Sequence, residues 1–188
     1  MHVTAPVVDP PVDMATANIT TWSDCVLHIY NDDYLGIRAA ASALPGHKLV
    51  LPRRSWSREF LEQCHEAVLR LSLNRVVFHG MSEAITSVAR FFAWKSPRLR
   101  LFGVYHGNVS QWNDPQERSA AKEFLRLDAE GTYFRSHILK PGGDSVLRSP
   151  APKLLVNCAP RDLVNSSPGR SRGIAFIPAP DIWRKNIY

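Results

Sequence analysis

The sequence has no long apolar run and only three cysteines among its 188 residues. A helix needs about 20 consecutive apolar residues to cross a bilayer, so no transmembrane segment is predicted. The amino terminus lacks a basic region followed by an apolar core, which argues against a secretory signal peptide. The cysteines lie far apart and without the spacing of a zinc site, which is typical of reduced thiols in a cytoplasmic protein without a metal. They are Cys25, Cys64 and Cys158.

Glycine-rich nucleotide-binding loops are also missing. No Gly-x-Gly-x-x-Gly follows the first apolar run, where Gly36 is the nearest glycine, and the chain contains no Walker A sequence. Such loops let the backbone approach a pyrophosphate or surround phosphate groups at a helix N-terminus. We therefore expect no dinucleotide or P-loop nucleotide site within this domain, and no cofactor.

Acidic residues are fewer than basic ones: the sequence has 17 Asp and Glu and 23 Lys and Arg, which gives a net charge of +6. Excess positive charge favours an anionic partner, such as a phosphate group, a nucleic acid or a membrane surface. The basic residues are scattered, and no stretch interleaves them with aromatic residues, which argues against nucleic acid. A solvated surface that is basic without a dedicated partner explains the same composition.

Apolar runs alternate with helical patterns through the middle of the chain. This alternation implies βαβ units with right-handed crossovers and a mostly parallel sheet. We therefore predict an α/β protein with a Rossmann-like, doubly wound fold and helices on both faces of the sheet. The predicted strands are 25–30, 48–51, 75–79, 98–105 and 131–138, and the predicted helices are 34–44, 57–73, 82–94 and 115–128. Ser57 and Asp114 are the expected N-caps of the second and fourth helices.

Three regions are predicted along the chain. Residues 1–22 are rich in Pro, Thr, Val and Ala without periodicity and are expected to form a flexible arm. Residues 23–172 contain the predicted α/β domain, including a further apolar, β-like run at 153–158. Residues 173–188 are expected to form a final strand and the hinge or start of a second domain.

Two neighbouring predicted strands end in the same dipeptide: His79-Gly80 ends one and His106-Gly107 ends the next. Ligands of open α/β sheets bind outside the carboxyl ends of the strands. An imidazole can act as a general base near neutral pH, and glycine, here with Asn108 beside it, lets a ligand approach the backbone closely. We expect the two dipeptides to share a cleft. The alternative is that each histidine only bonds a neighbouring carbonyl.

Ser82 follows the first of these dipeptides in a small-x-Ser-x-small pattern, which is typical of a nucleophile elbow. A serine hydrolase of this type needs a histidine after its triad acid, for which Asp162 is the candidate. All seven histidines precede Asp162 in the chain. Without that base the serine is a weak nucleophile, so an N-cap role for Ser82 is favoured and a hydrolase is the third hypothesis.

The acidic pair Asp32-Asp33 follows the first predicted strand. Phosphoreceiver domains carry acidic residues at this position, but they also need an aspartate at the end of the third strand. His79-Gly80 stands there instead. Capping of the next helix and negative charge in its first turn is the preferred interpretation of the pair.

The strand, His-Gly, helix and second strand that ends in the run 101–108 resemble the N-terminal, acceptor-binding domain of GT-B glycosyltransferases. Residues 173–188 resemble the start of the donor domain in retaining members, where a strand, a Gly-Arg pair, an acidic spacer and an Arg-Lys-Gly follow one another. Pro178-Ala179 replaces the Gly-Arg pair here, and Asn186 replaces the final glycine. The family's glycine-rich loop after the first strand is absent. The resemblance covers roughly residues 25–188.

This resemblance implies transfer of a sugar from a nucleotide-diphosphate sugar to a hydroxyl acceptor. It implies that a second chain or domain completes the cleft, and that the chain alone turns over poorly or not at all. A basic groove on such an enzyme can also dock on an anionic lipid surface. The implied residues are His106 for catalysis, His79, Gly80, Ser82, Gly107 and Asn108 for the acceptor, and Lys185 with Arg184 for the donor diphosphate. The second hypothesis is a non-catalytic α/β interaction domain whose basic surface meets an anionic partner.

Overall fold

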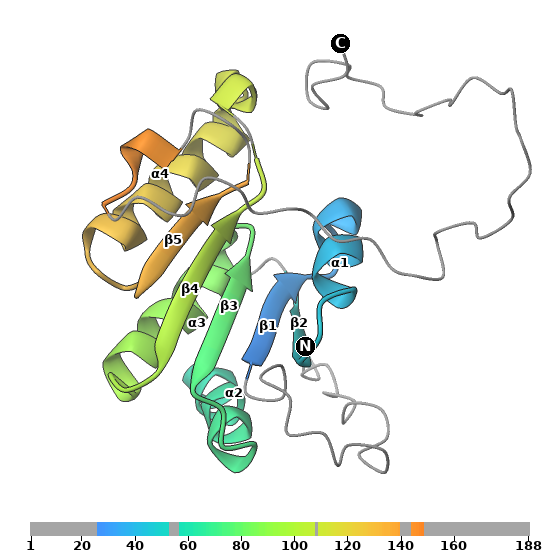
Figure 1. The fold of residues 1–188 in the computed structure, drawn as a ribbon, viewed down its shortest axis with the longest axis vertical. Helices are drawn as coiled ribbons and strands as arrows, with labels where there is room; N and C mark the ends of the chain where they lie inside the picture. Colours follow the sequence, from blue (N-terminus) through green and yellow to red (C-terminus); the bar gives the residue numbers. More distant parts are fainter. Residues whose placement is uncertain (1–25, 53–56, 108, 140–143, 149–188) are drawn as a thin grey trace, which may run out of the picture.

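The computed structural model describes residues 26–52, 57–107, 109–139 and 144–148 (Figure 1). Within these residues, five parallel strands form one sheet in the order β2-β1-β3-β4-β5. The strands are β1 (Val26–Asn31), β2 (His47–Leu51), β3 (Arg75–His79), β4 (Arg100–Tyr105) and β5 (Arg135–Ile138). The helices are α1 (Leu35–Ser42), α2 (Arg58–Arg70), α3 (Glu83–Lys95) and α4 (Pro115–Ala129), with short 3-10 helices at Val109–Asn113 and Asp144–Val146.

The sheet is wound in two directions from its second position. The connection from β1 to β2 runs one way, and the three later connections run the other way. Because parallel crossovers are right-handed, α1 covers one face and α2, α3 and α4 cover the opposite face; Figure 1 shows α2 and α3 behind the sheet. The predicted α/β, Rossmann-like doubly wound fold with helices on both faces is confirmed.

Three of the four long helices begin at the expected capping residue. Ser57 Oγ accepts a hydrogen bond from the Phe60 amide, and Ser82 Oγ accepts one from the Ile85 amide. Asp114 Oδ1 accepts hydrogen bonds from the first two amides of α4 that need a partner, with Pro115 at the first helical position. These caps satisfy amide groups that the helix itself leaves unpaired.

The prediction for the acidic pair Asp32-Asp33 is wrong. The residue that precedes α1 is Tyr34, which makes no side-chain cap, and the first turn of α1 holds no acidic residue. The reason lies in the end of β1. The buried Asn31 amide group donates to Leu51 O and Pro52 O, and the Asp32 amide also donates to Leu51 O. These bonds hold Asn31 and Asp32 against the end of β2, and Tyr34 takes the N-cap position of α1.

The main core lies between the sheet and the helices α2, α3 and α4. Its largest fully buried side chains are aromatic and aliphatic: Tyr133, Phe78, Phe92, Phe124, Ile29, Leu51, Ile85, Leu101 and Leu127. β4 makes room for two of these rings with a glycine. A Cβ atom on Gly103 would lie 2.6 Å from Cε2 of Tyr133 and 2.9 Å from Cε2 of Phe124. The glycine therefore lets both rings pack directly on the strand.

The structure describes one of the three cysteines, and it also describes the helices in which a transmembrane segment would lie. Cys64 is a free, buried thiol in α2, and burial raises its pKa to about 12, so it is protonated at neutral pH. Cys25 and Cys158 lie outside the described residues. Among the helices that the structure describes, none is long and apolar enough to span a bilayer. The predicted arm at 1–22, the run at 153–158 and the segment at 173–188 also lie outside the described residues.

Candidate functional site

The structure brings together the two histidines that end β3 and β4. His79 lies beside Val104 in the parallel pairing of these strands. His106 follows Val104 by two residues and so lies on the same face of the sheet. The distance between His79 Nδ1 and His106 Nε2 is 3.1 Å, which is a hydrogen bond between two imidazole rings. The two imidazoles therefore meet near the carboxyl edge of the sheet, and the cleft that their dipeptides are expected to share stays a prediction.

A third histidine, which the sequence reasoning missed, continues this contact. His28 in β1 lies beside Val77, two residues before His79 on the same face. The distance from His28 Nδ1 to His79 Nε2 is 2.9 Å, and His28 Nε2 lies 3.0 Å from the carbonyl oxygen of Pro45. We call His28, His79 and His106 the histidine chain.

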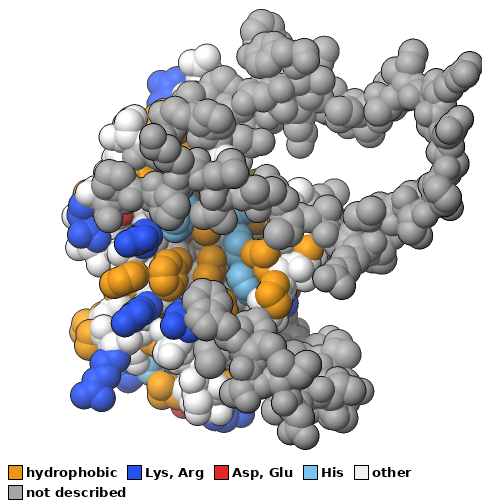
Figure 2. Space-filling model, viewed as in Figure 1, with side chains coloured by type: hydrophobic (Ala, Val, Ile, Leu, Met, Phe, Trp, Pro, Cys, Tyr) orange, Lys and Arg blue, Asp and Glu red, His pale blue; other side chains and the backbone are white. Residues whose placement is uncertain are grey.

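The histidine chain crosses the face of the sheet that carries α1. Pro45 lies in the turn between α1 and β2, at the amino ends of the strands, whereas His106 lies just beyond the carboxyl end of β4. His28 and His79 are 6% and 3% exposed, and His106 is half-buried. Figure 2 shows histidine side chains among apolar ones near the middle of this face, with Lys and Arg nearby. The histidine chain thus connects the buried interior of the protein to the sheet edge where ligands of such sheets bind.

Burial keeps the two inner imidazoles uncharged. The pKa of His79 is lowered to about 2, mainly by burial and then, in decreasing order, by the neighbouring His106, His28 and Lys48. Burial and Lys48 also lower the pKa of His28 to about 4, against the opposing effect of the Pro45 carbonyl. The Lys48 ammonium donates to Leu44 O and Gly46 O, and burial lowers its pKa to about 8.

Both glycines of the His-Gly dipeptides have a packing role. Gly80 has a φ of +80°, and a Cβ atom there would lie 2.8 Å from Cδ1 of Ile37 in α1. A Cβ atom on Gly107 would lie 2.7 Å from the ring of Tyr105. Close contacts within the protein therefore account for these glycines, whether or not a ligand also approaches them.

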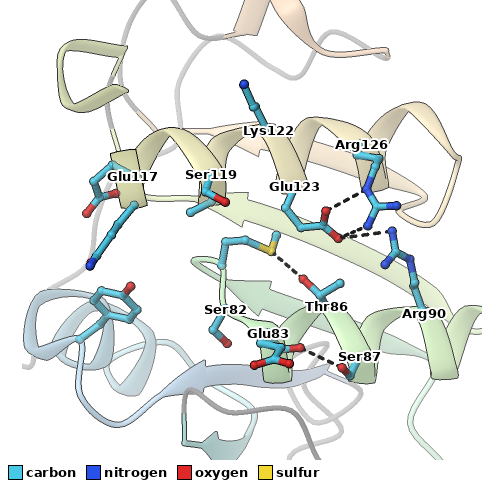
Figure 3. Close-up of a pocket in the computed structure, with 14 residues that line it drawn as sticks. Ser82, Glu83, Thr86, Ser87, Arg90, Glu117, Ser119, Lys122, Glu123 and Arg126 are labelled. Carbon is cyan, nitrogen blue, oxygen red and sulfur yellow. Dashed lines mark hydrogen bonds and ion pairs between the residues drawn. The ribbon is translucent and has the colours of Figure 1, made fainter. Parts of the chain in front are cut away.

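Ser82 lies on the other side of the sheet, in a polar groove between α3 and α4 (Figure 3). The groove has a volume of about 1120 Å³. Its lining is rich in hydroxyl and charged side chains: Ser82, Thr86, Ser87, Ser119, Glu83, Glu117, Glu123, Arg90, Lys122 and Arg126. At one end of the groove, Glu123 forms ion pairs with Arg90 (3.3 Å) and Arg126 (2.7 Å) (Figure 3).

Ser82 therefore lies on the opposite side of the sheet from the side chain of His79, with which the family resemblance grouped it for acceptor binding. His79 and His106 are not among the described residues that line the groove. The cause is the turn at Gly80: β3 ends with the His79 side chain on the α1 face, and the chain then enters α3 on the opposite face. Ser82 Oγ lies 3.1 Å from the Ile85 amide as the N-cap of α3, the role that the sequence favoured over a nucleophile.

Asn108, Arg184, Lys185 and the candidate triad acid Asp162 lie outside the described residues. In the described part of the chain, no three His, Cys, Asp or Glu side chains are grouped to hold a metal ion. In the histidine chain, four of the six ring nitrogens are taken up in contacts with the neighbouring ring, so the rings bond in series rather than converge on one point.

These features define a doubly wound α/β protein with the strand order 2-1-3-4-5 and a topological switch point between β1 and β3. Comparison with protein-family models and with curated protein sequences finds no match. Among solved structures, the chain is similar to the crystal structure of UDP-GlcNAc 2-epimerase from Neisseria meningitidis bound to UDP-GlcNAc, with a TM-score of 0.48 and 9% sequence identity. The likeness covers 70% of this chain and 45% of the epimerase chain, so this chain spans less than half of the length of the epimerase. The fold class rests on the strand order and the crossovers.

Proposed function

We propose that this chain is the acceptor-binding part of a GT-B-like glycosyltransferase, which transfers a sugar from a nucleotide-diphosphate sugar to a hydroxyl group. The sequence resemblance to that family suggests the reaction. The observation that carries the proposal is the position of His106 at the carboxyl edge of the sheet, where its Nε2 is hydrogen-bonded to the buried His79. An imidazole held in this way can orient a hydroxyl group or take its proton.

In the proposed reaction, the acceptor oxygen forms a bond to the anomeric carbon of the donor sugar. The bond between that carbon and the diphosphate oxygen breaks, and the nucleoside diphosphate leaves with the electron pair. The hydroxyl proton passes to His106. Because both ring nitrogens of His79 contact other histidines, we assign His79 to the positioning of His106 rather than to the acceptor itself.

The polar groove between α3 and α4 is the proposed second contact region for a saccharide. Sugar hydroxyl groups both donate and accept hydrogen bonds, and the groove offers carboxylates, hydroxyls and basic groups side by side. Ser82 belongs to this region in the proposal. Gly80 and Gly107 remain proposed acceptor contacts beside His106, and Asn108 keeps the same proposed role. Arg184 and Lys185 remain the proposed contacts of the donor diphosphate.

The proposal is tested by ligand-dependent thermal unfolding of the purified chain with a panel of glycosides and nucleotide sugars. A ligand present at 100 times its Kd stabilises the native state by about 2.7 kcal/mol, which corresponds to a rise in Tm of roughly 5–10 °C for a chain of this size. We expect at least one glycoside to raise the Tm of the wild type, and to raise that of the His106→Ala variant by less than half as much.

His65→Ala is the matched control. His65 is a buried histidine of α2 that bonds Ser96 and lies away from the histidine chain. The glycoside response of this variant should equal that of the wild type. A panel that leaves the Tm of the wild type unchanged, for glycosides and nucleotide sugars alike, would contradict the proposal.

The second candidate function is a non-catalytic interaction domain, and the composition of the α1 face favours it. Phe134 is 54% exposed, packs edge-on against Phe102 and lies 5.3 Å from the guanidinium of Arg100. Val50 is also exposed on this face. An anionic partner bound here would dissociate steeply as salt is added, because exposed charges are screened. Binding of a neutral glycoside would change little over the same range.

A further inference from the structure

We infer that the histidine chain is a tautomer lock, in which the carbonyl of Pro45 at one end fixes which ring nitrogen of His106 carries the proton at the other end. The value of such a lock for catalysis rests on the proposed function. The lock itself is a property of the protein alone and can be tested without a substrate.

The carbonyl oxygen of Pro45 has a fixed role, because a carbonyl oxygen can only accept a hydrogen bond. His28 Nε2 lies 3.0 Å from this oxygen and so must carry a proton. A neutral imidazole has one N–H and one lone pair, so the lone pair of His28 is on Nδ1. The orientation of the first ring is thus set by a group that cannot change its role.

This constraint fixes the donor and the acceptor in the two remaining hydrogen bonds as well. His28 Nδ1 can only accept, so His79 must donate from Nε2, 2.9 Å away. The lone pair of His79 is then on Nδ1, and His106 must donate to it from Nε2 across 3.1 Å. In its neutral form, His106 therefore holds its own lone pair on Nδ1.

The lock needs the inner rings to stay neutral. An imidazolium donates from both nitrogens, and two donors facing each other make no hydrogen bond. Burial disfavours that charge, as the lowered pKa values of His28 and His79 reflect. Lys48, beside His28 in the neighbouring strand, adds a positive charge that the Leu44 and Gly46 carbonyls hold in place.

Such a lock suits a general base. A histidine in solution exchanges between two tautomers, and only one of them presents a lone pair at a given nitrogen. In many enzymes a carboxylate selects the tautomer and also stabilises the imidazolium that forms. Here a neutral ring selects it. Because His79 resists protonation, a proton taken up by His106 stays on His106, and His79 and His28 act as positioning residues.

The test is ¹⁵N NMR of the full chain labelled in its histidine rings, at neutral pH. We expect His28, His79 and His106 each to show the Nε2–H tautomer, with scalar coupling between the nitrogens of neighbouring rings across each hydrogen bond. An Nδ1–H tautomer on His106 in the wild type would overturn the inference without the need for any variant.

The sharper test is His28→Leu, which changes a residue that does not bond His106. Without the His28 acceptor, His79 is no longer held in one tautomer, and we expect His106 to show both tautomers. His65→Leu, which removes an equally buried histidine outside the histidine chain, should leave His106 with Nε2–H alone. A folded His28→Leu variant with an unchanged His106 tautomer would contradict the lock; if this variant does not fold, the wild-type spectrum decides. Failure of every glycoside to bind, with the lock present, would contradict only the proposed function.

Discussion

Acidification from about pH 7.5 to about pH 5 is expected to lower the free energy of unfolding by about 4 kcal/mol through His28 and His79 alone. Both side chains are buried in the folded protein, where their pKa values fall from 6.5 to about 4 and about 2. The unfolded chain takes up a proton at each of these residues near pH 6.5, whereas the folded chain does not. Each of the two histidines therefore lowers the free energy of unfolding by about 1.4 kcal/mol for each pH unit below pH 6.5.

The sign follows from the direction of the two shifts. A lowered pKa in the folded state means that the unfolded state binds more protons, so stability rises with pH. The contribution is fully present above about pH 6.5 and is lost as pH falls, down to about pH 4 for His28. Burial also lowers the pKa values of His65 and His137, which adds to the loss in the same direction.

Urea unfolding of the wild type and two variants over this pH range measures the effect. The variant His28→Leu/His79→Leu removes both groups and should lose about 4 kcal/mol less than the wild type between the two pH values, whatever its stability at neutral pH. Lys48→Met removes a positive charge that lowers both pKa values, so it should also weaken the acid sensitivity, by a smaller amount. Equal pH slopes for the wild type and the double variant would contradict the assignment.

The elements of this fold were predictable because each depends on local sequence. Apolar runs, helical periodicity and capping side chains such as Ser57 and Asp114 place strands and helices within a few residues of their observed ends. Asp32-Asp33 is the exception, since the hydrogen bonds that Asn31 makes to the end of β2 cannot be read from local sequence. Those bonds hold the chain against a strand that comes later in the sequence.

The site was predictable only in part because it depends on strand order. His79 and His106 end consecutive strands, so their meeting follows from a single βαβ unit. His28 joins them because the chain reverses direction after β2 and places β3 beside β1. Its one signal in the sequence is a polar residue in the middle of an apolar strand. The separation of Ser82 from His79 also needs the fold, since it depends on which face each helix covers.

Gly103→Ala is expected to destabilise the protein by about 1–3 kcal/mol or more, because the site behind β4 is filled by two rings. The added Cβ would lie 2.6 Å from Tyr133 and 2.9 Å from Phe124, both of which are fully buried. Urea unfolding measures the loss. Tyr133→Leu makes space for the added Cβ atom. The loss of unfolding free energy in the double variant Gly103→Ala/Tyr133→Leu should therefore be smaller than the sum of the losses in the two single variants.

Gly36→Ala is the matched control and should change stability in the opposite direction. Gly36 lies in α1, is exposed and would place its Cβ in open space. Alanine has the higher helix propensity, so a gain of up to about 1 kcal/mol is expected. A destabilising effect of the same size at both glycines would mean that the rings behind β4 are not what requires Gly103.

The substitution Gly103→Ala also tests the histidine chain. One face of β4 packs against the aromatic core, and His106 follows the strand on its other face. Steric overlap with Tyr133 can be relieved by movement of the ring or of the strand, and movement of the strand would lengthen the 3.1 Å contact between His79 and His106. We expect the coupling between these two rings to weaken in Gly103→Ala, whereas the coupling between His28 and His79 should remain. An unchanged His79–His106 coupling would mean that the rings alone absorb the overlap, and that the position of His106 is independent of the core behind it.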